Sequence, residues 1–212
     1  MATYNPGITG AFSGKIGGVV ASSWRKVSYF RSQGKTSKKP ATIEQLSQRT
    51  RLALCTTYLS PIKDVIRLGY SDKNLGKLSG YNAAARMFMA TAITGIYPDF
   101  MIDFSAFKIS KGPLTQVFAL NMTATADNMT LSWKSILNKY TSFVNDKVMV
   151  VVYNETKSMY FIFDSAIRGD ESFSMETGAD FSGDTLHAWC FTLKFDETVT
   201  SHSQYAGSVT LA

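Results

Sequence analysis

The sequence has few of the side chains from which catalytic and metal sites are usually built. Its 212 residues include only two histidines and two cysteines. His187 and His202 both lie in strand patterns, where a histidine is more often a half-exposed sheet residue than a ligand, so we expect no metal site. No Cys–His pairing supports nucleophilic catalysis. The sequence therefore predicts no catalytic residue, no metal and no cofactor, and favours a protein that is not an enzyme.

The two cysteines fall in different kinds of pattern. Cys55 lies in a helical pattern and Cys190 in a strand pattern. Two buried free thiols in a reducing compartment are the favoured interpretation, and a disulfide between them is the alternative.

Long hydrophobic runs are also missing. No apolar run approaches the roughly 20 residues that a membrane-spanning helix needs. The first ten residues, "MATYNPGITG", contain no cationic segment followed by an apolar one, so they do not resemble a signal peptide. We expect no membrane span and synthesis in a cytoplasm, with packaging into a virion or another assembly as a further destination.

Negative charge is absent from one end of the chain. The net charge is +6, yet residues 1–40 contain no carboxylate side chain. Residues 1–70 hold eleven Lys or Arg against two acidic residues, whereas residues 71–212 hold eleven against fourteen. Such asymmetry indicates either a nucleic-acid-binding surface or head-to-tail contact between copies of the same protein.

Residues 1–40 are predicted to form a glycine-rich, basic β-ribbon or arm. From Gly10 to Gln33 apolar and polar residues alternate, with glycine and serine pairs that suggest bends or a hairpin. A ribbon this short is marginal by itself, so it needs a further surface to pack on, either in its own chain or in another subunit.

Residues 41–95 are predicted to be helical. Thr42 and Gln45 form a capping-box pattern that begins a helix ending near Leu59. Ser60 as a cap and Pro61 at the first position predict a second helix that ends at Gly69. A third helix is expected from Ser79 or Gly80 to Ile93.

Residues 96–113 are predicted to be a connector, partly strand, before seven short strands in residues 114–212. The strand segments are 114–123, 128–135, 147–155, 158–165, 171–177, 184–195 and 201–212. This number of strands in about 100 residues is typical of an immunoglobulin-like β-sandwich. In strand count, length and the position of Trp133, these residues resemble a fibronectin type III domain. The predicted fold class is therefore α+β.

The candidate functional site is the basic and aromatic stretch within the arm. As an assembly arm it would be anchored by Val19, Val20, Trp24, Val27, Tyr29 and Phe30. As a nucleic-acid site it would neutralise phosphates with Arg25, Lys26, Arg31, Lys35, Lys38 and Lys39, while its aromatic residues stack on bases. We favour packing or assembly, because interfaces between proteins are also enriched in aromatic residues and Arg.

Several motifs give the chain a family resemblance. "GxxGxFSGKIGGVV…W…YFRS", followed by "KPATIEQLSQR", resembles an uncharacterised family of Bacteroidota proteins with a P-x-T-x-x-Q helix start, although Arg49 stands one position later than in that pattern. The later "YNAA", "YPDF", "ISKGPL" and "SHSQYAGSVTL" also fit. The resemblance implies no activity and no catalytic residues.

Three classes of function are compatible with these observations. The first is a structural protein of a virion, tail or filament that self-assembles through the arm and forms homo-oligomers, with other structural proteins as further partners. The alternative is a nucleic-acid-binding protein that uses residues 24–39. A carbohydrate- or surface-binding module is the second alternative, and it rests on analogy with other β-sandwiches.

Overall fold

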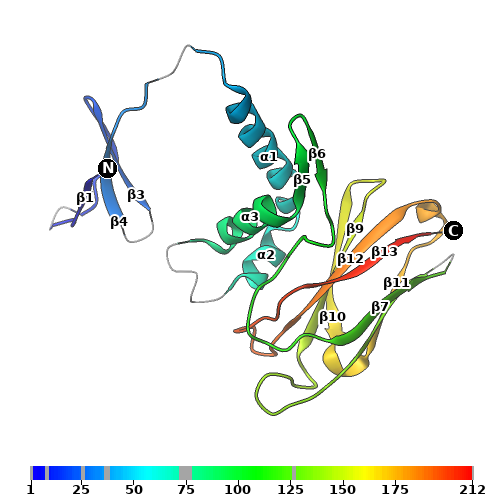
Figure 1. The fold of residues 1–212 in the computed structure, drawn as a ribbon. Coiled ribbons are helices and arrows are strands. Elements are labelled where there is room, and N and C mark those ends of the chain that lie inside the picture. The colour runs from blue at the N-terminus through cyan, green and yellow to red at the C-terminus, as the bar shows by residue number, and fades with distance from the viewer. Residues whose placement is uncertain are drawn as a thin grey trace. The chain divides into compact units, whose positions relative to one another are not determined.

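A computed structural model describes residues 2–7, 10–24, 27–35, 39–71, 78–125 and 128–211. The chain folds as two compact units, Met1–Thr42 and Ile43–Ala212. Strands outnumber helices in the described residues, and all the strand pairs within the sheets are antiparallel, as the α+β prediction requires (Figure 1).

The smaller unit is a four-stranded sheet, here called the N-terminal sheet. It consists of β1 (Ala2–Tyr4), β2 (Gly14–Ile16), β3 (Val19–Trp24) and β4 (Val27–Ser32), in the order β1-β4-β3-β2. The hairpin of β3 and β4 agrees with the predicted ribbon. Strand β1 was not predicted, because its three residues are too few to show alternation. It is held in the sheet by pairing with β4 and by the Tyr4 ring, which stacks on the Phe30 ring with 4.5 Å between the ring centres.

The larger unit begins with three helices. They are α1 (Ile43–Leu59), α2 (Lys63–Gly69) and α3 (Gly80–Thr91). Ser79 caps the start of α3, because its side chain accepts a hydrogen bond from the Asn82 amide. The predicted start of α2 is wrong: the helix begins at Lys63 without a side-chain cap, because residues 60–62 form a turn. Its end at Gly69 is confirmed, and packing explains why this last helical residue is a glycine. A Cβ on Gly69 would lie 2.6 Å from the Ile109 carbonyl oxygen.

The predicted connector contains regular structure. Strands β5 (Ile93–Ile96) and β6 (Asp99–Ile102) form a hairpin, which begins three residues earlier than the predicted connector. No helix in the described part of the chain is long and apolar enough to span a membrane.

Seven strands follow, one in each segment that the alternation predicts. They are β7 (Phe118–Ala124), β8 (Asn128–Lys134), β9 (Lys147–Asn154), β10 (Met159–Ile167), β11 (Ser172–Glu176), β12 (Thr185–Leu193) and β13 (Gln204–Thr210). They form a four-stranded sheet, β10-β9-β12-β13, and a three-stranded sheet, β11-β8-β7.

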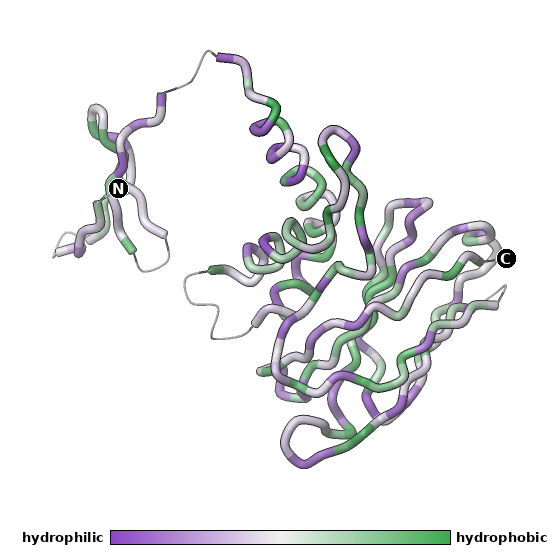
Figure 2. The backbone as a smooth tube through the Cα atoms, viewed as in Figure 1, coloured by the Kyte–Doolittle hydropathy of each residue, from purple (hydrophilic) through white to green (hydrophobic). Residues whose placement is uncertain are grey.

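The four-stranded sheet is covered on both faces. On one face Val151, Trp189 and Phe191 share a core with α1, α2 and α3. On the other face Val150 and Cys190 share a core with Leu131 and the rest of the three-stranded sheet. The hydrophobic runs of β9 and β12 therefore lie in the middle of a three-layer arrangement (Figures 1 and 2).

This layering changes the expected domain organisation. Residues 41–95, 96–113 and 114–212 were predicted as separate segments, whereas the structure unites them from Ile43 onward. The physical reason is the sequence of β9 and β12, which contain continuous apolar runs, Val148–Tyr153 and Ala188–Phe191, instead of an apolar residue at every second position. A strand of this kind must bury both of its faces, so one face requires the helices.

Candidate interaction surfaces

The N-terminal sheet divides the predicted arm residues between two faces. Cross-strand pairs project to the same face, and Ala21 pairs with Phe30 while Ser22 pairs with Tyr29. Val19 and Phe30 therefore share one face. The other anchors lie on the opposite face: Val20, Trp24, Val27 and Tyr29. These six residues were predicted to act as one group of anchors, but the sheet places them on two opposite faces.

The first face carries no charged side chain and is called here the uncharged face. Its strand residues are Ala2, Tyr4, Gly14, Ile16, Val19, Ala21, Ser23, Ser28, Phe30 and Ser32. Phe12 joins this face through its ring contact with Tyr4, whose hydroxyl accepts a hydrogen bond from the Phe12 amide at 2.7 Å. Three large side chains remain open to solvent: Phe12 is 50% exposed, Ile16 68% and Val19 45%.

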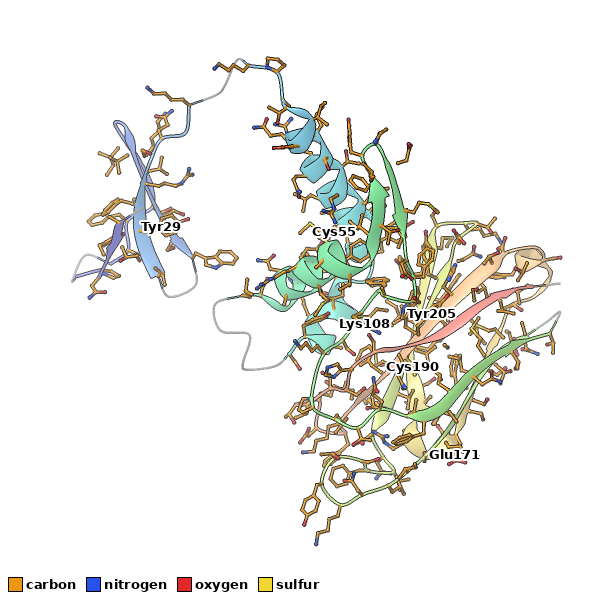
Figure 3. The ribbon with its side chains drawn as sticks, in the orientation of Figure 1. Tyr29, Cys55, Lys108, Glu171, Cys190 and Tyr205 are labelled. Atoms are coloured by element: carbon orange, nitrogen blue, oxygen red, sulfur yellow. The ribbon has the colours of Figure 1, made fainter. Side chains whose placement is uncertain are left out.

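The second face combines cations with aromatic rings and is called here the basic–aromatic face. Lys15, Val20 and Arg31 form one row across three strands, and Trp24 and Tyr29 lie on the same side (Tyr29 is labelled in Figure 3). The Trp24 side chain is 54% exposed. Lys35 and Lys39 follow β4 and lie outside the sheet, and the predicted contacts Arg25, Lys26 and Lys38 lie outside the described residues.

A second surface was not found by sequence reasoning. Between the edge strands β10 and β11 there is a cavity of about 450 Å³, called here the β10–β11 groove. It is lined by Phe161, Phe163, Ser165, Phe173, Ser174, Met175, Glu176 and Phe181. The aromatic run of β10 was visible in the sequence, but a position at the edge of a sheet depends on strand order, which alternation does not encode.

The histidine predicted to be half-exposed is buried. His187 in β12 is 7% exposed, and its ring lies 4.0 Å from the Phe104 ring. Its Nδ1 atom is 2.8 Å from the Tyr205 hydroxyl and its Nε2 atom is 3.1 Å from Glu155. These bonds join β12 to β13 and to the end of β9. The chain Glu155–His187–Tyr205 thus ties three elements together beneath the helical layer.

The second histidine, His202, also contacts another part of the chain. His202 precedes β13, and its Nδ1 atom is 2.7 Å from the Gly112 carbonyl oxygen. In the described part of the chain, no group of three or more His, Cys, Asp or Glu side chains could hold a metal ion.

Both cysteines are free and buried, in agreement with the favoured prediction (Figure 3). Cys55 lies in the helical core and Cys190 in the core between the two facing sheets. Burial raises the pKa of Cys55 to about 11 and that of Cys190 to about 12, so both are thiols near neutral pH. Because the thiolate is the reactive form, neither is suited to act as a nucleophile.

Comparison with known proteins gives a family without an assigned role. No curated protein matches the chain. One family model, described as a family of unknown function (DUF6266), matches residues 11–207 and so includes most of the N-terminal sheet and nearly all of the larger unit. This agrees with the predicted membership of an uncharacterised family, while the Bacteroidota origin and the helix-start motif stay predictions. The chain belongs to the DUF6266 family.

Proposed function

We propose that this protein is a non-enzymatic structural component of a virion, a tail or a filament, and that it self-associates through its N-terminal sheet. The observation that carries this proposal is the exposure of Phe12, Ile16 and Val19 on the uncharged face. Among the described residues of this unit, Ala21 is the one hydrophobic residue that is buried. A sheet with so little core gains stability when another surface covers it.

The driving force for such an association is the burial of apolar side chains. Full burial of a Val, Ile or Phe side chain contributes about 1.5–3 kcal/mol relative to leaving it in water. Because Phe12, Ile16 and Val19 are each about half exposed, the three side chains together offer about one and a half times that amount before the entropic cost of association is subtracted. No charged group of this face has to be desolvated, which favours a protein partner over a polyanion.

The facing sheets suit an interaction role. We propose that β7–β13 form an immunoglobulin-like sandwich of the fibronectin type III kind. In immunoglobulin constant domains the first, second, fourth and fifth strands form one sheet, and the third, sixth and seventh form the other. The order found here supports a variant of this partition, in which the fourth strand, β10, pairs with the third, β9.

Size-exclusion chromatography with light scattering, at low and high salt, tests the proposed function. The unmodified chain should form an oligomer that contains no nucleic acid and survives salt, and Ile16→Glu should dissociate it. Ile96→Glu is the matched control, because Ile96 is 84% exposed in the larger unit. Deletion of residues 1–33 should also abolish the oligomer. A chain that is monomeric at all concentrations, or an oligomer unaffected by Ile16→Glu, contradicts the proposal.

The basic–aromatic face supports a second candidate function, binding of single-stranded nucleic acid. Lys15 and Arg31 can neutralise phosphates while Trp24 stacks on a base from the same side of the sheet. Lys15→Glu with Arg31→Glu should then weaken binding of an oligonucleotide, and the affinity should fall steeply with salt. Salt-independent binding, or none, removes this candidate. A carbohydrate-binding role stays a prediction from fold analogy.

A further inference from the structure

Strand β10 presents an unusually apolar sheet edge. Its residues Tyr160–Phe163 form a continuous apolar run, and among the described residues only β9 pairs with it. Natural proteins usually protect an edge of this kind, because its free backbone groups and apolar side chains recruit other strands. Next to it the β10–β11 groove exposes part of the inner layer, including Phe161, Phe163 and Phe173.

The surroundings of this edge are acidic. From Met159 to Asp184 the chain contains six carboxylate side chains, and Arg168 is the single basic residue. Arg168 is fully buried and paired with Asp146, so it does not offset the surface charge. Lys157, just before β10, is bound to Asp184 at 3.0 Å. The exposed carboxylates of this region are Asp164, Asp170, Glu171, Glu176 and Asp180 (Glu171 is labelled in Figure 3).

The N-terminal unit has the opposite properties. Residues 1–42 contain seven Lys or Arg side chains and no carboxylate side chain. Strand β2 is an edge of the N-terminal sheet, with Ile16 on the uncharged face and Lys15 on the basic–aromatic face. A basic edge strand with one apolar side is thus available within the same chain whose larger unit has an acidic, apolar edge.

We propose that the β10–β11 groove receives the N-terminal sheet of a second copy of this chain, with β2 of that copy added beside β10. This inference rests on the proposed function and names the surface that the arm binds. Main-chain hydrogen bonds between the two edges would provide affinity, and alternate side chains would set the register.

Side-chain alternation makes the arrangement specific. In β10, Phe161 and Phe163 point into the core between the facing sheets, so Ile162 and Asp164 point to the opposite side. When Ile16 of the second copy extends the layer of Phe161 and Phe163 over the groove, Lys15 emerges on the side of Asp164. One docking event therefore covers apolar surface on both partners and pairs their charges.

The geometry has a consequence for the assembly. The two partners use different surfaces, so the contact is heterologous: one copy retains an unused groove and the other an unused arm. Heterologous contacts generate a ring when the rotation between copies closes, and an open filament when it does not. The proposal thus predicts a head-to-tail assembly, in keeping with the opposite charges of the two ends of the chain.

A charge-exchange experiment with full-length chains tests the proposal. The first variant reverses the charge at the β10–β11 edge, with Asp164→Lys beside the groove and Glu176→Lys in its lining, and the second reverses the arm, with Lys15→Glu and Arg31→Glu. All four residues are exposed. Each variant alone should self-associate at least about tenfold more weakly than the unmodified chain, because like charges meet at the interface. An equimolar mixture should associate again, since the unmodified arm of one variant meets the unmodified groove of the other.

Further variants distinguish a specific loss of binding at the groove from a general loss of folding. Ser165→Lys places a long side chain in the groove and should weaken self-association in the same way, whereas Ser60→Lys adds the same charge at an exposed position outside the groove and should have no effect. Circular dichroism and thermal unfolding establish that each variant is folded.

The outcomes separate this inference from the proposed function. If the unmodified chain and the groove variants all assemble, the groove is not the receptor, while self-association stands. If groove and arm variants both fail alone and also fail as a mixture, the two surfaces do not bind each other. If the unmodified chain is a monomer, both proposals are wrong. Association of the mixture, with neither variant associating alone and both present in equal amounts in the complexes, supports the inference.

Discussion

The two units of this chain are built from short antiparallel strands, but they place their apolar side chains differently. In the N-terminal sheet, large apolar residues lie on both faces and Ala21 is the one described hydrophobic residue that is buried. In the larger unit, one sheet has a core on each side. The comparison shows that strand content alone does not make a stable domain; a second and a third layer are needed to bury the faces.

The largest expected effect comes from a matched pair of tryptophans. Trp189 is fully buried, packs on Phe107 and donates its indole N–H to the Phe104 carbonyl oxygen at 3.2 Å. Trp189→Ala should lower the free energy of unfolding by about 3–5 kcal/mol. Trp24→Ala, at the exposed end of β3, should change it by less than about 0.5 kcal/mol. Denaturant unfolding measures both, and similar losses would contradict the contrast between the units.

A buried charge should have an effect of similar or slightly smaller size. Arg168 is bound to Asp146 at 3.3 Å and donates to the Thr115 and Gln116 carbonyl oxygens. Arg168→Met would leave the Asp146 carboxylate buried without its cation, at a cost of about 3–5 kcal/mol in the free energy of unfolding.

Two controls accompany the Arg168 variant. Replacing both partners, Arg168→Met with Asp146→Leu, should recover much of the loss in denaturant unfolding. Arg31→Met on the N-terminal sheet should change stability by less than about 0.5 kcal/mol, because Arg31 is exposed. If the double variant is no more stable than the single one, the loss comes from packing rather than from an unpaired charge.

A pair of glycines should give a moderate difference. At Gly69 a Cβ would meet the Ile109 carbonyl oxygen at 2.6 Å and the Ser110 Cβ at 2.7 Å, so Gly69→Ala forces two backbone segments apart. We expect a loss of about 1–3 kcal/mol in thermal or denaturant unfolding. At Gly18, beside β3, a Cβ would meet nothing within 4 Å, so Gly18→Ala should be close to neutral. Equal effects would mean that the close approach at Gly69 relaxes freely.

The smallest effect should appear on acidification. Hydrogen bonds from Asn154 and Lys157 hold the pKa of Asp184 below its ordinary value of 3.8. A carboxylate whose pKa is lowered by folding stabilises the folded state above its ordinary pKa. This contribution is lost as the pH falls from that value toward the lowered pKa.

The acid effect can be isolated with one variant. Thermal unfolding from neutral pH to below the ordinary carboxyl pKa should show that Asp184→Asn is less stable at neutral pH and that the difference shrinks on acidification. The N-terminal unit has no carboxylate side chain in residues 1–42, so its structure should be insensitive to the same titration. A constant difference between variant and unmodified chain would show that Asp184 is not the group responsible.

Much of the strand structure was predictable from the sequence because alternation is a local property. All seven segments from residue 114 onward contain a strand, and the end of α2 at Gly69 follows the expected signal. The start of α2 was wrong because Ser60 and Pro61 occupy a turn. The hairpin of β5 and β6 was predicted only in part, since four-residue strands carry little periodic signal.

The candidate site was less predictable. The stretch containing Val19 and Trp24 was correctly assigned to strands, but its division into an uncharged face and a basic–aromatic face requires the register of β3 against β4. The alternation of residues along each strand indicates which of its side chains share a face, but not how the faces of neighbouring strands match. The β10–β11 groove had no signal in the sequence, because it arises where the edges of two sheets meet.

The amino-acid order sets the local periodicities, the charge difference between the two ends and the apolar runs of β9 and β12. The order of strands is different in kind: β12 lies between β9 and β13, and His187 meets Glu155 and Tyr205 only because these three strands are neighbours. Which strands become neighbours depends on the total apolar surface area that the layers bury against one another. Because this quantity depends on contacts between residues distant in the chain, no local pattern contains it.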